Sequence, residues 1–308
     1  MVLSSRLTAD GPRLRQSLKG ERTLKLARYG PKGHERPAVL TEAGERLDLS
    51  GHFDDWNALF FAGQGLDRLR GILSNSSHDL PRTDMSARIG APVARPGKIV
   101  CIGLNYSDHA RESGMPIPSE PIIFLKAPNT VVGPNDDVWI PRGSVKTDWE
   151  VELAIVLGSE ARYLDSAQAA RSCIAGYTIC HDVSEREFQL ERGGQWTKGK
   201  SCDTFTPLGP YLLTADEVPD PQALTMRLAV NGVQCQSGST ATMIFGCDTL
   251  VHYLSQFMTL EPGDVISTGT PPGVGLGMKP PRYLRSGDVV ELEIEKLGFQ
   301  RQTFVPSL

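Results

Sequence analysis

Two glutamates stand two residues apart at the start of a strongly apolar segment, residues 151–157. The residue types of this segment predict a buried strand that ends at Gly158. Side chains alternate between the faces of a strand, so Glu150 and Glu152 are expected to point the same way. Two buried like charges are costly unless a proton or a cation neutralises them, and an oxygen-binding divalent metal is the simplest such cation. The open alternative is an edge strand with a solvated acidic face.

A third acid, Asp182, ends another apolar segment that begins at Tyr177. Three carboxylates from two strand ends, with water completing the coordination, suit Mg²⁺ or Mn²⁺ better than Zn²⁺. Asp182 could instead cap the N-terminus of a polar helix expected over residues 183–192. Both roles stay open because a carboxylate has two oxygens.

A histidine and a glutamate follow the predicted strand 98–103, in residues 103–112 (GLNYSDHARE). A spacing of three on a helical turn places Glu112 beside His109. A carboxylate on one ring nitrogen fixes the tautomer and raises the basicity of the other nitrogen, which gives a general base able to activate water. The alternative is an ordinary solvent-exposed helical turn.

Two further segments carry polar groups. The loop after Trp196 contains Lys198 and Lys200; a lysine beside a carboxylate–metal site could stabilise an oxyanion, and a solvated basic loop is the alternative. Residues 266–277 (ISTGTPPGVGLG) lead from a strand into a glycine-rich loop that matches neither a P-loop nor a dinucleotide-binding fingerprint. Its hydroxyls and backbone N–H groups could hold a carboxylate.

The composition narrows the class of protein. The 308 residues are 40% hydrophobic and 22% charged with a net charge of −4, which is ordinary for a globular chain. We expect no nucleic-acid partner, because no basic patch is present, and no membrane partner, because no apolar run approaches the ~18–20 residues of a membrane span. The six cysteines are scattered and predict reduced core thiols in a cytoplasmic protein.

The elements that must position these groups are mostly strands. Residues 1–22 predict a leader or disordered extension, residues 23–91 a small β-rich N-terminal domain, and residues 92–308 the catalytic domain, with a proline-punctuated linker over 81–96. A helix is expected over residues 56–74. Runs of strands with short connections and few helices favour an α+β, mainly β architecture with antiparallel or mixed sheets.

Together the motifs resemble the fumarylacetoacetate hydrolase family. GLNYxxH, DxExEL, a strand-end Asp, WxxxK and TGTPxGVG occur in this order between about residues 98 and 305. The resemblance implies a mixed β-sandwich roll with a small N-terminal domain, a homodimer, and a Mg²⁺ or Mn²⁺ ion in the mouth of the roll. The large fumarylacetoacetate hydrolases have a fourth metal carboxylate seven residues before the histidine, where this chain has Ile102. The chain is therefore similar to the smaller, three-carboxylate subgroup.

The resemblance also implies roles for individual residues. These are Glu150, Glu152 and Asp182 as metal ligands, His109 and Glu112 as the water-activating pair, Lys200 at the oxyanion, Arg186 and Gln189 at the keto-acid end of the substrate, and Thr270 at its carboxylate.

The expected activity is that of a hydrolase acting on carbon–carbon bonds in ketonic substances (EC 3.7.1.-). Its substrate would be a 2,4-diketo acid, either an acylpyruvate or a 2,4-diketo-3-deoxy sugar acid such as the L-rhamnonate or L-fuconate derivative, and its products pyruvate and a second acid. The alternatives are an oxaloacetate decarboxylase, a ureidoglycolate lyase-type enzyme and a non-catalytic keto-acid-binding protein. The last is disfavoured because every reactive position is filled.

Overall fold

The computed structural model describes residues 23–307 with the exception of residues 113 and 115. The extension expected over residues 1–22 lies outside the described residues.

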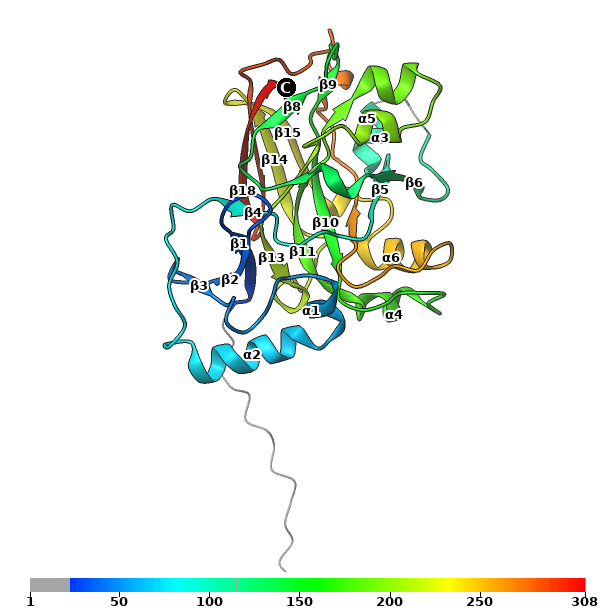
Figure 1. Cartoon of the computed structure of the whole chain (residues 1–308). Coiled ribbons are helices and arrows are strands. Elements are labelled where there is room, and N and C mark those ends of the chain that lie inside the picture. Colours follow the sequence, from blue (N-terminus) through cyan, green and yellow to red (C-terminus); the bar gives the residue numbers. More distant parts are fainter. Residues whose placement is uncertain (1–22, 113, 115, 308) are drawn as a thin grey trace, which may run out of the picture.

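A large mixed sheet forms the centre of the described chain (Figure 1). Its strand order is β3-β2-β1-β13-β11-β10-β16-β5-β6, with β4 paired to β1 and β7 paired to β13. The strands are β1 (Lys25–Tyr29), β2 (Arg36–Leu40), β3 (Arg46–Asp48), β4 (Ile89–Gly90), β5 (Ile99–Gly103), β6 (Ile122–Lys126), β7 (Val131–Val132), β10 (Val151–Leu157), β11 (Ile174–His181), β13 (Thr206–Thr214) and β16 (Val265–Ser267).

A second sheet packs against the large one and has the order β15-β14-β17-β18-β8. It contains β8 (Val138–Ile140), β14 (Thr225–Val230), β15 (Val233–Ser239), β17 (Val289–Ile294) and β18 (Gly298–Pro306), and a separate short pair joins β9 (Thr147–Asp148) to β12 (Ser184–Glu185). Most pairs are antiparallel, but β16–β5, β18–β8 and β13–β7 are parallel. The expected α+β, mainly β class with mixed sheets is therefore confirmed.

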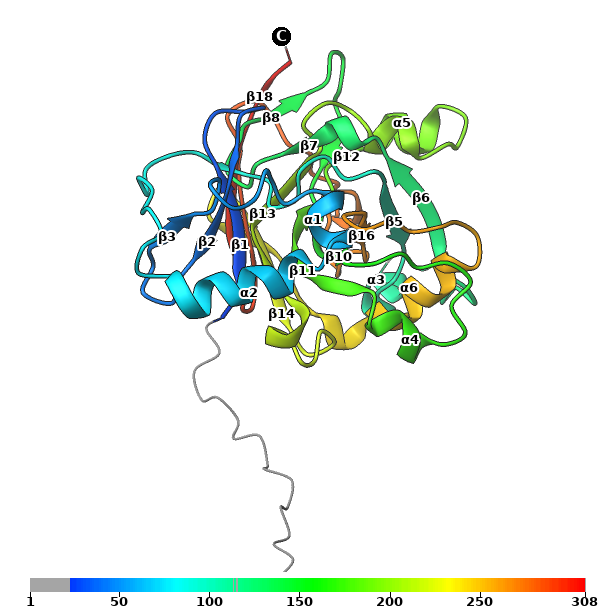
Figure 2. The same ribbon diagram turned by 60° about the horizontal axis from the view of Figure 1, so that its bottom comes forward.

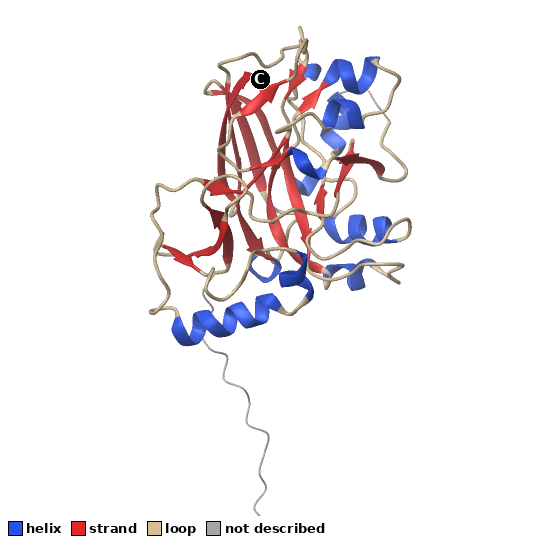
Figure 3. Cartoon of the chain, viewed as in Figure 1, coloured by secondary structure: helices blue, strands red, loops and turns tan. Residues whose placement is uncertain are grey.

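Helices are short and lie around the sheets (Figure 3). The α-helices are α1 (Ala58–Ala62), α2 (Gly65–Ser76), α3 (Ser107–Glu112), α4 (Ala167–Arg171), α5 (Thr197–Lys200) and α6 (Cys247–Ser255). Single helical turns of other types are η1 (Pro128–Thr130), η2 (Glu187–Glu191), η3 (Ala215–Glu217), η4 (Thr240–Thr242) and η5 (Gly275–Gly277). No helix among the described residues is long and apolar enough to cross a membrane.

Strand β10 is covered on both faces, as its continuous apolar sequence predicts. Leu153, Ile155 and Leu157 belong to the hydrophobic core that the second sheet shares. Ala154 and Val156 belong to a second core on the opposite face, which includes residues of the N-terminal segment. Glu150 and Glu152 point to the same face as Ala154 and Val156. The two acids therefore lie at the end of the row of apolar side chains on that face.

The N-terminal strands continue the large sheet. Strand β1 pairs with β2 on one side and with β13 on the other, where Lys25 lies opposite Leu213. Helix α2 crosses the ends of β1, β2 and β3 (Figure 2) and contributes Leu69 and Leu73 to the second core. The sheet therefore runs across the boundary expected near residue 92.

Two helix predictions need correction. The helix expected over residues 56–74 is two helices, separated at Gln64, whose backbone is left-handed with φ 58°. The polar helix expected over residues 183–192 is wrong for its first part, because Ser184 and Glu185 pair with Asp148 and Thr147 of β9. Helical geometry covers only Glu187–Glu191, so Asp182 caps no helix.

His181, the last residue of β11, is fully buried. Its Nδ1 lies 2.9 Å from Oε1 of Gln302, and its Nε2 has no partner among the described residues. Burial lowers the pKa of His181 to about 4, and the Gln302 contact offsets this only in part. The folded chain therefore holds this ring neutral well below the usual histidine pKa.

We expect the free energy of unfolding to fall as the pH drops from about 6.5 to about 4, because the unfolded chain then binds a proton that folded His181 excludes. The loss from this residue should reach roughly 3 kcal/mol at the acid end. Urea unfolding in EDTA at several pH values should show a shallower pH dependence for His181→Gln than for the wild type. Parallel curves for the two proteins would contradict this assignment.

Candidate active site

A cavity of about 460 Å³ opens beside the start of β10. It is lined by Ile102, Gly103, Leu104, His109, Phe124, Glu150, Glu152, Arg186, Gln189, Leu190, Trp196, Lys200, Thr270, Val274, Leu276 and Gly277. Seven of the nine predicted site residues line this one space, and the other two lie against members of that lining: Glu112 beside His109, and Asp182 beside Lys200. A larger cavity of about 660 Å³ near the N-terminal segment has no such concentration of carboxylates, and its Arg28 and Asp55 pair with each other.

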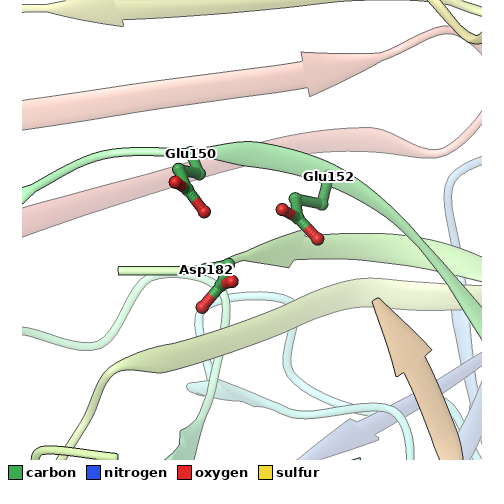
Figure 4. A group of neighbouring side chains, drawn as sticks. All are labelled: Glu150, Glu152 and Asp182. Atoms are coloured by element: carbon green, nitrogen blue, oxygen red, sulfur yellow. The ribbon is translucent and has the colours of Figure 1, made fainter. Parts of the chain in front are cut away.

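Glu150, Glu152 and Asp182 converge on one point (Figure 4). One carboxylate oxygen of each lies within 4.8 Å of the others, and all three residues are buried. Register explains the meeting: Val151 of β10 lies opposite His181 of β11, so the next residues outward, Glu150 and Asp182, face each other. The Asp182 N–H donates to the Glu150 carbonyl oxygen at 3.0 Å, which fixes the pair of strand ends.

Three cations contact Glu150, Asp182 and the neighbouring Asp148. Lys200 Nζ lies 2.6 Å from Glu150 Oε2 and 2.7 Å from Asp182 Oδ2. Arg186 bridges Glu150 at 2.7 Å and Asp148 at 2.8 Å. Lys126, at the end of β6, lies 2.6 Å from Asp182 Oδ1 and is fully buried. Each group would be costly to bury alone, and together they satisfy one another.

Sequence reasoning missed two members of this cluster. Asp148 is two residues before Glu150, so alternation along the strand predicts that its side chain points to the same face as Glu150 and Glu152. Its two oxygens accept hydrogen bonds from the backbone N–H groups of Gly275 and Leu276, which ties the glycine-rich loop to the acids. Lys126 is the last residue of an apolar strand. The sequence does not show whether a single lysine at such a position is buried or exposed, so its place in the cluster could not be predicted.

The cluster shifts the pKa values of Glu150 and Glu152 in opposite directions. Burial disfavours the charge of Glu150, yet Lys200 and Arg186 lower its pKa to about 2. Burial and the neighbouring Asp182 and Glu150 raise the pKa of Glu152 well above its usual value. The pKa of Lys200 is raised because Asp182 and Glu150 outweigh its burial. Glu152 is therefore the acid of this group that a proton neutralises most readily.

The donor set fits a hard divalent cation. Glu152 Oε2 accepts from the Ser267 hydroxyl at 2.5 Å and from the Gly269 N–H at 3.0 Å, whereas its Oε1 accepts no hydrogen bond from the described residues. Buried carboxylate oxygens from two strand ends are the ligands that Mg²⁺ and Mn²⁺ prefer. The three predicted ligands thus lie close enough together to bind one ion.

His109 and Glu112 lie side by side on α3, as their spacing predicts. His109 Nδ1 is 3.4 Å from Glu112 Oε2, and the same oxygen accepts the Gly273 N–H at 3.2 Å. The His109 side chain is mostly buried and lines the cavity that Glu150 and Glu152 also line. The arrangement can hold one imidazole nitrogen against a carboxylate and leave the other toward the cavity.

The loop between β5 and α3 is clamped to the glycine-rich loop. The Asn105 side chain donates to the carbonyl oxygens of Thr268 at 2.8 Å and Phe245 at 3.0 Å. Gly269 has φ 95°, and a Cβ there would lie 2.9 Å from Asn105 Cβ, so this position requires glycine. The clamp sets the distance between α3 and the ends of β10 and β16.

Gln189 and Thr270 also line the cavity, and both are already hydrogen-bonded. Gln189 Oε1 accepts from Arg186 at 3.0 Å. The Thr270 hydroxyl donates to the Val151 carbonyl oxygen at 2.9 Å and accepts from Gln236 at 2.8 Å. Gln189 therefore lies next to the cation expected at the keto-acid end, and Thr270 lies over the first residue of β10.

Comparison with known proteins agrees with this geometry. Residues 98–305 match the fumarylacetoacetate (FAA) hydrolase C-terminal family. A Burkholderia multivorans protein with a general hydrolase name is 53% identical over 280 residues, which cover 91% of this chain and 98% of that protein.

Two solved structures share the fold. Maleylpyruvate hydrolase from Sphingobium sp. SYK-6, in complex with manganese(II) and pyruvate, is 27% identical with a TM-score of 0.76, and the match covers 92% of this chain and 100% of the other. The 2-hydroxyhepta-2,4-diene-1,7-dioate isomerase from Mycobacterium marinum is 32% identical with a TM-score of 0.71, covering 92% and 99%. The extent of these matches and the order of the motifs lead to one conclusion: this chain belongs to the fumarylacetoacetate hydrolase family.

Proposed function

We propose that this protein is a divalent-metal-dependent hydrolase that cleaves a 2,4-diketo acid into pyruvate and a second carboxylic acid. The observation that carries the proposal is the presence, on one cavity, of a carboxylate cluster suited to a metal and a histidine–glutamate pair suited to activating water. The similarity to a hydrolase whose structure contains manganese(II) and pyruvate supports it.

The charges of the cluster suit a metal and a monoanionic ligand. Four carboxylates (Asp148, Glu150, Glu152 and Asp182) face three cations (Lys126, Arg186 and Lys200), which leaves one excess negative charge. A proton on Glu152 removes that excess, in keeping with its raised pKa. With a divalent metal in place of the proton the cluster carries one positive charge, which one keto-acid carboxylate neutralises.

Glu150, Glu152 and Asp182 would hold the metal, which supplies binding and polarisation of the keto-acid oxygens. Arg186 fixes the orientation of Glu150, and Gln189 fixes that of Arg186. Lys200 is buried and contacts two of these residues, Glu150 and Asp182, and it would stabilise the oxyanion of the reaction.

His109 acts as the general base, oriented by Glu112. It takes a proton from water, and the resulting hydroxide adds to the 4-carbonyl carbon. The bond between carbons 3 and 4 then breaks, its electron pair passes to carbon 3 as the enolate of pyruvate, and that carbon regains the proton. One water is consumed for each pyruvate and carboxylic acid released.

The similarity to a dienedioate isomerase makes isomerisation the second candidate. An isomerase moves a proton and a double bond but releases no pyruvate. Pyruvate formation from an acylpyruvate panel, a 2,4-diketo-3-deoxy sugar acid and oxaloacetate, with Mg²⁺, with Mn²⁺ and with EDTA, tests the proposal. Metal-dependent pyruvate plus a carboxylic acid supports the hydrolase, turnover of oxaloacetate alone indicates a decarboxylase, and no pyruvate from any substrate contradicts the proposal.

Replacing His109 by Ala should leave Mn²⁺ binding intact and lower kcat by about 10²–10⁴, because the general base is lost. His78→Ala, at an exposed position, is the matched control and should leave kcat unchanged. Metal titration and steady-state kinetics on both variants check the prediction; full activity of the His109 variant would rule out its role.

Mn²⁺ affinity should weaken as the pH falls, by up to about tenfold per unit, because the metal competes with the proton that the raised pKa of Glu152 retains. Glu152→Gln should bind Mn²⁺ more weakly and with a smaller dependence on pH. Free Mn²⁺ measured by electron paramagnetic resonance between pH 6 and 8 gives both slopes. A wild-type dissociation constant that is constant over this range would be incompatible with proton displacement.

Lys126→Met removes one of the three cations and leaves the buried Asp182 carboxylate with Lys200 as its remaining cationic contact among the described residues. In EDTA we expect the free energy of unfolding to fall by about 3–5 kcal/mol. Mn²⁺ should then raise Tm more in the variant than in the wild type, because the metal replaces the missing charge. Thermal unfolding with and without Mn²⁺ measures the difference, and an equal rise in both proteins would show that Lys126 does not balance the metal charge.

A further inference from the structure

The cavity has two chemically different parts. The carboxylates, Arg186, Lys200 and Gln189 gather at one part, while Ile102, Leu104, Phe124, Trp196, Val274 and Leu276 contribute hydrocarbon to the lining. We infer that the substrate carries an uncharged, apolar acyl group, alkyl or aryl, on the pyruvate unit, rather than a second carboxylate or a hydroxylated sugar chain. This inference rests on the proposed function and narrows its substrate class.

A second carboxylate would find no cation in this cavity that is not already paired with carboxylates. The two cations that line it, Arg186 and Lys200, each already contact two carboxylates. With a divalent metal bound, a single keto-acid carboxylate is enough to neutralise the cluster. A further buried carboxylate would therefore stay uncompensated, which is strongly unfavourable in a site of low polarity.

Sugar hydroxyls would fare little better. Thr270 uses its hydroxyl proton on the Val151 carbonyl oxygen, and Gln189 lies at the keto-acid end of the cavity, where its amide oxygen accepts from Arg186. His109 is engaged with Glu112 and is needed for water. Hydroxyl groups placed against the hydrocarbon lining would lose their hydrogen bonds to water without gaining protein partners. Such unpaired polar groups would strongly lower kcat/KM for a sugar substrate.

One wall of the cavity is aromatic and fixed in place. The rings of Phe124 and Trp196 meet edge to face with centroids 5.3 Å apart. A Cβ at residue 103 would lie 2.7 Å from the Trp196 ring, so the indole packs directly on the Gly103 backbone. Lys200 Nζ lies 5.1 Å from the Phe124 ring, which places this wall next to the reacting centre.

Two leucines at the rim are partly exposed. Leu190 on η2 is 45% exposed and Leu276 on η5 is 38% exposed, although both line the cavity. A Cβ at residue 277, next to Leu276, would lie 3.5 Å from Glu112 Oε2, so this rim adjoins the water-activating pair. An apolar acyl group that reaches the rim would cover these side chains and gain their burial.

Steady-state kinetics on synthetic acylpyruvates with Mn²⁺ tests the inference. From acetylpyruvate to butanoylpyruvate to hexanoylpyruvate, kcat/KM should rise by up to roughly fourfold per methylene, the amount that burial of one methylene provides. Succinylpyruvate and 4-methylpentanoylpyruvate form a pair of similar shape in which only the first has a second carboxylate. The apolar member should be favoured at least about tenfold, and also over a 2,4-diketo-3-deoxy sugar acid.

Leu276→Arg places a cation at the rim and should shift the preference toward succinylpyruvate by at least about tenfold. Leu59→Arg is the matched control, because Leu59 is an 81% exposed leucine on α1 that does not line this cavity, and it should leave the preference unchanged. Equal or better use of succinylpyruvate or the sugar acid by the wild type would overturn the inference alone. Absence of pyruvate from every acylpyruvate would instead overturn the proposed function together with it.

Discussion

Buried charge is the constraint on which the rest of this structure depends. Four carboxylates are held inside the protein at the ends of β9, β10 and β11, where an unpaired charge would oppose folding. Their partners come from segments far apart in the chain: Lys126 from β6, Arg186 before η2, Lys200 from α5, and the backbone of residues 269–276. Satisfying the acids thus fixes the loops around them and gives the cavity its walls.

The local parts of the site could be predicted from the sequence. Alternation in residues 150–157 indicates that Glu150 and Glu152 share a face, and a spacing of three places Glu112 beside His109; both arrangements are found. These predictions succeed because they depend on the periodicity of a single element. The sequence predicts only that Asp182 lies at the end of another strand. The β10–β11 register is what shows that it faces Glu150.

The non-local parts could not be predicted. Lys126 becomes a partner of Asp182 through the packing of β6, which no pattern in residues 122–126 expresses. The short β9–β12 pair replaces the start of an expected helix because two-residue strands carry too little sequence to reveal their partner. A family resemblance supplies the fold, but the same fold accompanies a hydrolase and an isomerase, so the reaction depends on the lining of the cavity rather than on the scaffold.

The pairing of β1 with β13 has a consequence for how the chain acquires its structure. Lys25 and Leu26 are synthesised long before the strand edge that they join, at Leu212 and Leu213. Until then β1 and β2 can form a hairpin with one unpaired apolar edge, and such edges promote association with other chains. Closure of the large sheet therefore has to wait for β13, and because it joins residues far apart in the sequence it carries a high entropic cost.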